Sequence, residues 1–340
     1  MQKMNAVGLF ESLPAENEES LQNIEVEKPS PQGRDILVEV KAVSINPVDT
    51  KVRGSVKEKL EEPKILGYDA AGVVVATGEE VSLFSPGDEV YYAGSVGRQG
   101  TNSEFHLVDE RITAKKPSNL DFAEAAALPL TTITAWEAIY ERMHVSKDPE
   151  QNKGKTMLII GAAGGVGSIA VQIAKQAGLQ VIGTASRDET KEWVKARGAD
   201  HLINHHHNFK EQLQELSINE VDYIFCLHST DMHWEAMVEV AAPQSYICAI
   251  VDTAEKVDLA LLKQKSITFA WEFMFTRPLF TTPDMIEQHH LLTDAASLVE
   301  KGELATTMTE RLKGFDAENF RKGHQLLEEG KMIGKLVIEK

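Results

Sequence analysis

The sequence predicts an α/β protein in which a doubly wound parallel sheet is joined to a second, mostly antiparallel β domain. Three observations predict this fold class. Strand-like and helix-like segments alternate from Thr156 to about Ala270. Short β segments separated by Gly and Pro fill residues 1–120. The stretch IIGAAGGVG (159–167) places a turn of small residues directly after an apolar run. Alternation of this kind is typical of a parallel sheet covered on both faces.

Composition excludes several classes of function. The chain has 340 residues, enough for two domains, and its 42% hydrophobic and 26% charged residues are ordinary for a soluble globular protein. The formal net charge of −17 opposes binding to nucleic acid and to anionic membranes. No apolar run is long enough to span a bilayer, and the acidic N-terminal stretch is unlike a secretory signal. Cys226 and Cys248 lie in apolar runs, so we expect buried free thiols and a cytoplasmic protein.

The first domain is predicted from short alternating strands with turns between them. DILVEVKAVSI (35–45) and AGVVVATG (71–78) alternate, SPGDEVYYAG (85–94) is a turn into a strand, and EFHLVDE (104–110) is a further strand. Next, Asp121 and Glu124 form a capping pair ahead of an Ala-rich helix, Pro129 interrupts, and 131–143 is predicted as a second helix. This helical segment bridges the two domains.

The parallel sheet is predicted from six apolar segments with helices between them: 157–160, 180–184, 201–203, 222–227, 245–250 and 267–271. Helices near 283–300 and 316–329 and a strand at 335–339 follow. They do not continue the parallel pattern, so we expect them to return to the first domain. The predicted domains are 1–128 with 276–340, and 129–275 for the dinucleotide-binding domain.

The turn after the first strand of this sheet predicts a dinucleotide site. It lies in a strand-turn-helix-strand unit, where backbone N–H groups and the positive end of a helix can face a pyrophosphate. The pattern G-x-G-x-x-G is not fully met, because Ala162 occupies the first glycine place. A tight turn without a ligand is the alternative. The predicted cofactor-binding residues of the turn are Ala163, Gly164, Gly165, Val166 and Gly167.

The end of the second strand favours NADPH over NADH. An acid there would bind the ribose 2′-OH of NAD, but this chain has Ser186 and Arg187, with Lys191 close behind. A hydroxyl and two cations suit a 2′-phosphate. The alternative is that Ser186 and Glu189 form only a helix capping box, with Arg187 as solvated surface.

Four motifs together resemble the quinone oxidoreductase branch of the medium-chain alcohol dehydrogenases, a branch whose family names include "zinc-type". They are LGYDAAGVV (66–74), SPGDEVY (85–91), AAALPLTTITAWEAI (125–139) and GAAGGVGSIAVQIAKQAGLQVIGTAS (161–186). The resemblance covers nearly the whole chain. It implies a Rossmann domain inserted into a GroES-like, partly open β-barrel catalytic domain built from both ends of the chain.

The same resemblance argues against zinc. The family's catalytic zinc uses a Cys, a His-Glu pair and a further Cys or His. Asn46 stands near the first of these places, and Tyr68 and Asp69 stand at the His-Glu pair. The sequence also lacks the four closely spaced cysteines of a structural zinc loop. We therefore expect no zinc.

The resemblance also suggests residues that line the nicotinamide and the adenosine phosphate. Asn46, Tyr68 and Thr131 are the candidates for positioning the reactants, with Thr134 on the cofactor side. The alternatives are an ordinary Asn-Pro turn, a half-buried core tyrosine, and threonines that only cap or pack their helix. Lys335 either approaches the cofactor or is an exposed lysine before the last strand. His205 stands where related proteins carry a Tyr near the adenosine phosphate, and His205–His207 otherwise suggests a surface loop.

These features predict an NADPH-dependent oxidoreductase that passes hydride to a quinone or an α,β-unsaturated carbonyl compound. An enoyl-thioester reductase and a non-catalytic, crystallin-type cofactor-binding protein are the alternatives. A homodimer is expected through the strand 266–273, the last in the sheet order 3-2-1-4-5-6, with Ile267, Phe269, Trp271 and Phe273 on one face. The aromatic stretch 271–280 would shape an acceptor pocket or bury an interface.

Overall fold

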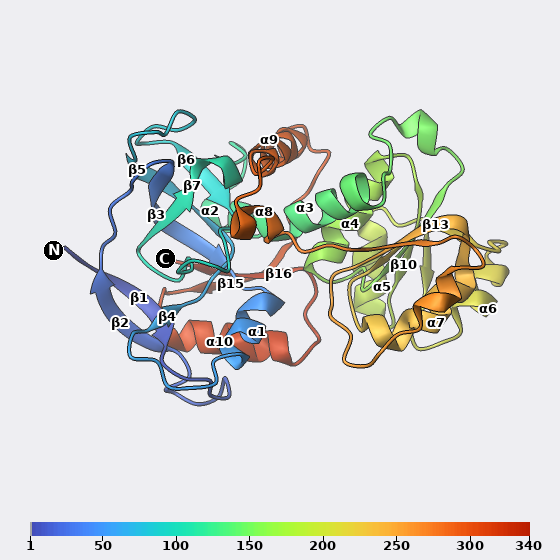
Figure 1. Cartoon of the computed structure of the whole chain (residues 1–340), viewed down its shortest axis with the longest axis horizontal. Coiled ribbons are helices and arrows are strands. Elements are labelled where there is room, and N and C mark those ends of the chain that lie inside the picture. The colour runs from blue at the N-terminus through green and yellow to red at the C-terminus, as the bar shows by residue number, and fades with distance from the viewer. Residues whose placement is uncertain (1) are drawn as a thin grey trace. The chain divides into compact units, whose positions relative to one another are not determined.

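The computed structural model describes residues 2–340 and divides into two compact units (Figure 1). The first unit comprises the residues up to Ile133 together with Phe275–Lys340, and the second comprises Thr134–Met274. The chain therefore leaves the first unit once and returns to it, so the second unit is an insertion.

The second unit is built on six parallel strands in the order β11-β10-β9-β12-β13-β14. The strands are β9 (Thr156–Ile160), β10 (Gln180–Thr184), β11 (His201–Ile203), β12 (Val221–Cys226), β13 (Ala241–Ala249) and β14 (Thr268–Trp271). The helices are η3 (Pro149–Asn152), α4 (Gly165–Gln176), α5 (Asp188–Ala196), α6 (Phe209–Glu215), α7 (Thr230–Val240) and η4 (Leu259–Leu262). Counted from β9, this order is 3-2-1-4-5-6, as predicted, and both cysteines are buried and free.

The first unit carries two sheets. One has the order β2-β1-β4, and the other runs β15-β16-β3-β5-β6-β8, with β7 paired to β3. The strands are β1 (Lys3–Leu9), β2 (Gln22–Glu27), β3 (Asp35–Ser44), β4 (Lys64–Ile65), β5 (Ala70–Thr77), β6 (Glu89–Tyr92), β7 (Phe105–Asp109), β8 (Thr113–Lys115), β15 (Met308–Lys313) and β16 (Lys335–Glu339). The last strand, β16, pairs antiparallel with β3, so the predicted return of the chain to its first domain is confirmed.

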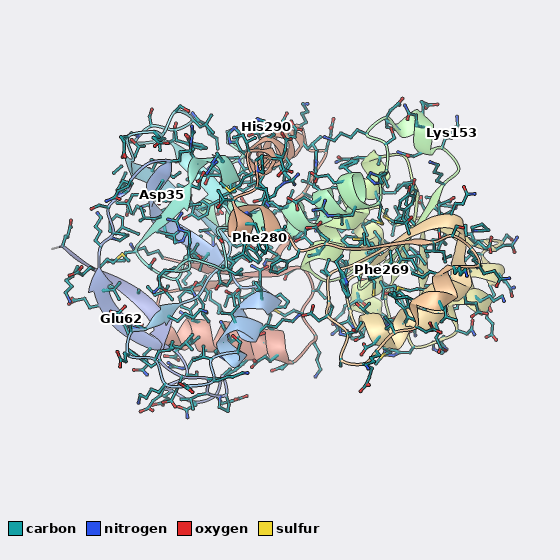
Figure 2. All side chains as sticks on the ribbon, in the orientation of Figure 1. Asp35, Glu62, Lys153, Phe269, Phe280 and His290 are labelled. Carbon is teal, nitrogen blue, oxygen red and sulfur yellow. The ribbon has the colours of Figure 1, made fainter. Side chains whose placement is uncertain are left out.

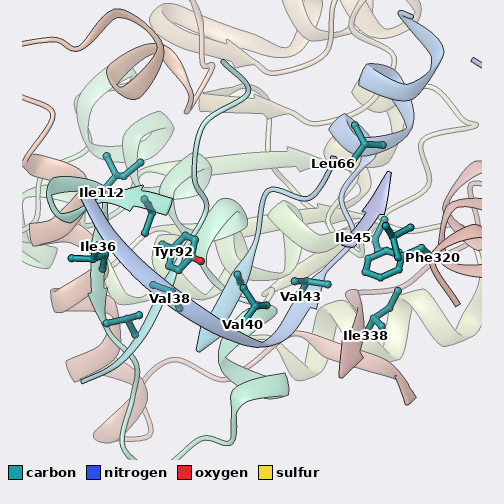
Figure 3. Packing of buried hydrophobic residues seen from close by; sticks show 14 of the residues in the cluster. Ile36, Val38, Val40, Val43, Ile45, Leu66, Tyr92, Ile112, Phe320 and Ile338 are labelled. Atoms are coloured by element: carbon teal, nitrogen blue, oxygen red, sulfur yellow. The ribbon is translucent and has the colours of Figure 1, made fainter. Parts of the chain in front are cut away.

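Seven helical segments complete this part of the chain: α1 (Pro47–Gly54), η1 (Glu110–Ile112), α2 (Phe122–Ala126), α3 (Pro129–Trp136), α8 (Thr276–Phe280), α9 (Glu287–Glu300) and α10 (Ala317–Glu328). The core of the first unit forms because alternate residues of β3 point to one face. Figure 3 shows Ile36, Val38 and Val40 on that strand, with Phe320 of α10 and Ile338 of β16 in the same buried cluster.

The predicted helix at 131–143 is two different structures. An α-helix, α3, begins at Pro129, which a first-turn position tolerates because its N–H would have no helical partner. The chain then continues as a π-helix, η2 (Glu137–Arg142), a rare geometry that sequence periodicity does not signal. The predicted capping pair ahead of α2 is confirmed, since Glu124 N–H donates to Asp121 (2.8 Å) and Asp121 N–H to Glu124 (3.0 Å).

The predicted strand 266–273 is too long. Only Thr268–Trp271 forms β14, because Ser266 has a left-handed backbone (φ 51°) and Ile267 N–H bonds back to Leu262 of η4. β14 is still the edge of the sheet and pairs only with β13. Between residues 2 and 340, no helix combines the length and the apolarity needed to cross a membrane.

Candidate functional site

Asn46, Asp49, Asp69 and Lys335 form a buried polar group in the first unit, which we name the lysine cluster. Lys335 begins β16 and is only 3% exposed, so the alternative of an exposed lysine is wrong. Its ammonium donates to Ile45 O (3.0 Å), to Asp69 Oδ2 (3.2 Å) and to Asn46 Oδ1. Three oxygens therefore surround this one cation.

Asn46 and Asp69 complete the cage around the ammonium. Asn46 Nδ2 donates to Asp69 Oδ2 (2.8 Å), and the other oxygen of Asp69 accepts the N–H of Leu130 (2.7 Å). Burial raises the pKa of Asp69 and lowers the pKa of Lys335, and the opposite charge of each partner counters both shifts. The pair is thus held as a hydrogen-bonded ion pair away from water.

Asp49 fixes the backbone beside this cage. It lies in the first turn of α1, directly after the predicted Asn46-Pro47 turn. Its two oxygens accept the N–H groups of Asn46 (2.7 Å) and Gly67 (2.9 Å), and burial raises its pKa to about 7. Asp49 is not among the site residues predicted from the sequence. The spacing N-x-x-D at the start of a helix is the signal that would have found it.

The lysine cluster does not fit a zinc ion. Asn46, Tyr68 and Asp69 stand at the ligand places that the resemblance gives, and zinc would need Cys, His or carboxylate lone pairs there. The lone pairs that Asn46 and Asp69 could offer already accept hydrogens from the ammonium and from amide groups. A dication beside that ammonium would also be repelled. Elsewhere in residues 2–340, no three His, Cys, Asp or Glu side chains are arranged to hold a metal.

The hydroxyl groups of Tyr68, Thr131 and Thr134 differ in their hydrogen bonding. Tyr68 is fully buried rather than half-buried, its ring contacts Phe275 edge-on, and its hydroxyl has no hydrogen-bond partner among residues 2–340. Burial, and then the charge of Asp49, raises the pKa of Tyr68. The Thr131 hydroxyl instead donates to Leu128 O (3.0 Å) within its own helical segment, and Thr134 is buried.

The glycine turn of the second unit joins β9 to α4. Gly161 has φ of +86°, Gly164 is the N-cap of α4, and residues 165–167 form the first turn of that helix. A Cβ on Gly167 would overlap Gly161 O and lie 2.6 Å from Ala162 Cα, so this glycine lets the helix pack on its strand. A Cβ on Gly164 would meet only Gly161 O at 3.5 Å, so Gly164 keeps space open to a ligand rather than to the protein. The residues fit a pyrophosphate beside the N-terminus of α4.

The predicted 2′-phosphate residues follow β10 and β11. Ser186 is half-buried and Arg187 is exposed, immediately before α5. The predicted capping box at Ser186 and Glu189 is wrong, because Arg187 is the N-cap and its N–H donates to the Thr190 hydroxyl (3.1 Å). Lys191 pairs with Asp188 (3.0 Å) on the surface.

His205 leaves the neighbouring strand at the same sheet edge. Ile203 of β11 pairs with Thr184 of β10, so His205 and Ser186 each lie two residues beyond a paired position. The structure thus brings Ser186, Arg187 and His205 to the edge that carries the glycine turn. It also brings Asn46 and Lys335 together, which no sequence pattern had linked.

The chain matches two family models, "alcohol dehydrogenase GroES-like domain" over residues 32–118 and "zinc-binding dehydrogenase" over residues 165–287. A zinc-type alcohol dehydrogenase-like protein of Staphylococcus aureus is 48% identical over 335 residues, covering 98% of this chain and 99% of that protein. The chain belongs to the medium-chain dehydrogenase/reductase superfamily. The resemblance to this superfamily, the Rossmann-type sheet and the GroES-like domain are thereby confirmed, and the protein is an oxidoreductase of this superfamily.

Two further proteins are similar to this chain over most of its length. A crystal structure of a Rhizobium etli protein, classed with the zinc-dependent alcohol dehydrogenases, is 51% identical with a TM-score of 0.95, covering 100% of this chain and 99% of that one. A chloroplastic quinone-oxidoreductase homolog of Spinacia oleracea is 28% identical over 333 residues, with 94% of each chain covered. Several of these names contain the word zinc, although the ligand places of this chain hold an ammonium.

Proposed function

We propose that this oxidoreductase transfers hydride from NADPH to quinones or α,β-unsaturated carbonyl compounds without a catalytic zinc ion. The observation that carries the proposal is the buried ammonium of Lys335, bonded to Asn46 and Asp69 at the family's zinc-ligand places. Such acceptors are already electron-poor, so their reduction needs alignment and a hydrogen-bond donor rather than a strong Lewis acid. The similarity to a quinone-oxidoreductase homolog supports this class of acceptor.

The second unit supports the cofactor half of the proposal. When bound, the nicotinamide would supply the hydride. The residues that would hold the dinucleotide are Ala163, Gly164, Gly165, Val166 and Gly167 at the pyrophosphate, and Ser186, Arg187, Lys191 and His205 at the 2′-phosphate. No Asp or Glu follows β10 before Asp188, which itself pairs with Lys191. This arrangement favours NADPH over NADH.

The first unit supplies a hydrogen-bond donor for the acceptor. Of the three predicted positioning residues, Asn46 is engaged with Lys335 and Asp69, and the Thr131 hydroxyl with Leu128. We assign to Tyr68 the donor that stabilises negative charge on the acceptor oxygen, because its hydroxyl has no partner within residues 2–340. Its raised pKa keeps the hydroxyl protonated at every physiological pH. Asn46 and Thr131 then keep positioning roles, and Thr134 and Lys335 remain candidates for the nicotinamide side.

Oxidation of NADPH with a panel of quinones and enones tests the proposal. We expect turnover with NADPH, slower turnover with NADH, and a fall in kcat of about tenfold to a hundredfold for Tyr68→Phe, the range of a lost oxyanion donor or less. Tyr92→Phe is the matched control, since Tyr92 is another buried tyrosine whose hydroxyl lies 3.1 Å from the ring nitrogen of His106.

Three outcomes would overturn the proposal. Binding of NADPH without oxidation by any acceptor would favour the non-catalytic alternative, and turnover restricted to enoyl thioesters would favour the thioester reductase. About one zinc per chain, retained by protein prepared without chelators and then dialysed, would contradict the zinc-free assignment.

We also propose a homodimer through β14. This strand is the edge of its sheet, and Trp271, its last residue, and Phe273, two residues further on, are each 48% exposed. An unpaired apolar edge is a template for a second copy. Phe269, labelled in Figure 2, is a poor test residue because its ring packs on Trp234 at 5.2 Å. Trp271→Lys should give a monomer in light scattering, whereas Phe280→Lys, on the exposed α8, should not; a wild-type monomer at micromolar concentration would refute this assembly.

A further inference from the structure

Four imidazole side chains gather at the carboxyl edge of the second unit's sheet, and we name them the histidine cluster: His205, His206, His228 and His233. The first two follow β11, His228 follows β12, and His233 lies at the start of α7. The rings of His205 and His206 are 4.2 Å apart, and the ring of His233 stacks on Phe209 of α6 at 5.5 Å. The cluster joins two loops and two helices around one edge of the sheet.

Burial and the neighbouring imidazoles disfavour protonation of His205 and His233. Burial, followed by repulsion from His206, His233 and His228, lowers the pKa of His205 to about 4. Burial, followed by repulsion from His228 and His206, lowers the pKa of His233. His205 and His233 are therefore held neutral near pH 7, and a negative charge brought beside them would favour their protonation.

The charged side chains on the surrounding elements do not supply a negative charge to the imidazoles. They are Lys210 and Glu211 of α6, Asp231, Glu235 and Glu239 of α7, and Arg187, Asp188 and Lys191 at the start of α5. Asp188 pairs with Lys191 (3.0 Å), and Glu239 pairs with Lys210 (3.1 Å). The carboxylate of Asp231 accepts the N–H groups of Ala254 and Glu255, and Glu211 and Glu235 are exposed. The shifts of His205 and His233 come from burial and from other imidazoles.

The register of the sheet brings this cluster to the proposed 2′-phosphate residues. Thr184 of β10 pairs with Ile203 of β11, and Ala185 N–H donates to Ile203 O (2.9 Å). Ser186 and His205 therefore leave adjacent strands at the same level. A hydroxyl, a guanidinium and an imidazole then share one edge, and these are the donors that a phosphoryl dianion needs.

We infer that the histidine cluster takes up protons when the 2′-phosphate of the dinucleotide binds, so that NADP(H) binding strengthens as pH falls while NAD(H) binding does not. The inference rests on the proposed NADPH specificity and adds proton coupling to it. The protons come from solvent and add to imidazole ring nitrogens, and no covalent bond of the dinucleotide changes. The cluster thus couples cofactor affinity, and cofactor choice, to pH.

The direction and the size of the change in affinity with pH follow from the linkage between ligand binding and proton binding. A ligand that raises the pKa of a histidine binds more tightly at lower pH, by up to about tenfold per pH unit for each proton taken up. A phosphate monoester itself gains a proton near pH 6, which opposes the effect below that value. The window for measurement is therefore about pH 6 to 8.

Calorimetric titration of the full-length protein with NADP⁺ and with NAD⁺ tests the inference, and the oxidised forms avoid the acid lability of NADPH. The titration is repeated in buffers of different ionisation enthalpy, which gives the number of protons taken up on binding. We expect more proton uptake with NADP⁺ than with NAD⁺, and a gain in NADP⁺ affinity of about threefold or more per pH unit as pH falls, which corresponds to half a proton. The variant His205→Gln/His228→Gln should lose most of both effects, whereas His207→Gln, an exposed histidine of the same loop, should keep them.

The possible results distinguish this inference from the NADPH specificity on which it rests. Equal proton uptake for both dinucleotides, or uptake unchanged in His205→Gln/His228→Gln, overturns the inference while leaving the NADPH assignment intact. Equal affinity for the two dinucleotides at every pH overturns the NADPH assignment and the inference together. The unfolding temperature of each variant, measured beside the titration, shows whether the variant is folded.

Discussion

The lysine cluster of the first unit and the carboxyl edge of the second unit both gather polar groups, but these groups differ in their exposure to solvent. In the lysine cluster the ammonium of Lys335 and the carboxylates of Asp49 and Asp69 bond to partners within the unit, away from water. At the carboxyl edge, Arg187 is exposed and Gly164 faces open space. Polar groups enclosed by the fold contribute to structure, whereas groups exposed at a sheet edge can also be reached by a ligand.

Breaking the lysine cluster should have the largest effect. Lys335→Met leaves Asp69 buried with its cation removed, and we expect a loss of about 3–5 kcal/mol in the free energy of unfolding. Denaturant unfolding measures it. The double variant Lys335→Met/Asp69→Asn should regain much of the loss, because no charge is then left unpaired; equal losses in the two variants would show that the ion pair is not what matters.

The second unit also has a buried carboxyl group. It tests whether burial raises the pKa of a carboxyl group in this unit as it does in the lysine cluster. Glu272 follows β14 and lies 2.8 Å from Arg142 Nε. Burial, followed by the charge of Glu137, raises its pKa to about 9. Because an acid with a raised pKa binds its extra proton only in the folded state, this contribution is full below about pH 4.5 and is lost as pH rises through about 9.

Glu272→Gln should therefore make the free energy of unfolding less sensitive to alkaline pH, by about 3 to 4 kcal/mol between pH 6 and pH 9. Thermal unfolding at several pH values measures this change. The exposed Glu235→Gln is the control in the same unit, and the same alkaline loss in wild type and Glu272→Gln would contradict the prediction.

Two glycines of one turn separate structure from binding. Gly167→Ala places a methyl group against the backbone of Ala162 and should cost about 2 kcal/mol in stability. Gly164→Ala meets almost no protein atom and should leave stability unchanged while weakening dinucleotide binding. Unfolding and fluorescence titration with NADPH measure the two effects. If Gly164→Ala binds NADPH like the wild type, the open side of the turn does not face the pyrophosphate.

The smallest effect is expected for Arg187, the exposed residue of the carboxyl edge. Arg187→Ala should weaken NADPH by about 1–3 kcal/mol, towards the lower end because the side chain is solvent-exposed, and should barely change NADH. Equal losses for both cofactors in a binding titration would remove Arg187 from the 2′-phosphate site.

The sequence by itself determined the features that depend on neighbours along the chain. The six strands, the turn at Gly161–Gly167 and the capping pair at Asp121 and Glu124 were predicted, because periodicity and turn chemistry act over a few residues. The strand order followed from the doubly wound dinucleotide-binding fold that the glycine turn indicated. Ser186 and Arg187 after β10 were identified from the sequence and His205 after β11 from the family resemblance, and their binding role stays a prediction.

Only the tertiary structure decided the features that join distant segments. Lys335 meets Asn46 and Asp69 across 289 and 266 residues, and no local pattern announces such a pairing. The π-helix at Glu137–Arg142, the short β14 and the burial of Tyr68 depend on packing, which overrides local propensity. The physical reason is that burial sets the cost of a polar group, and burial is known only once the whole chain has folded around it.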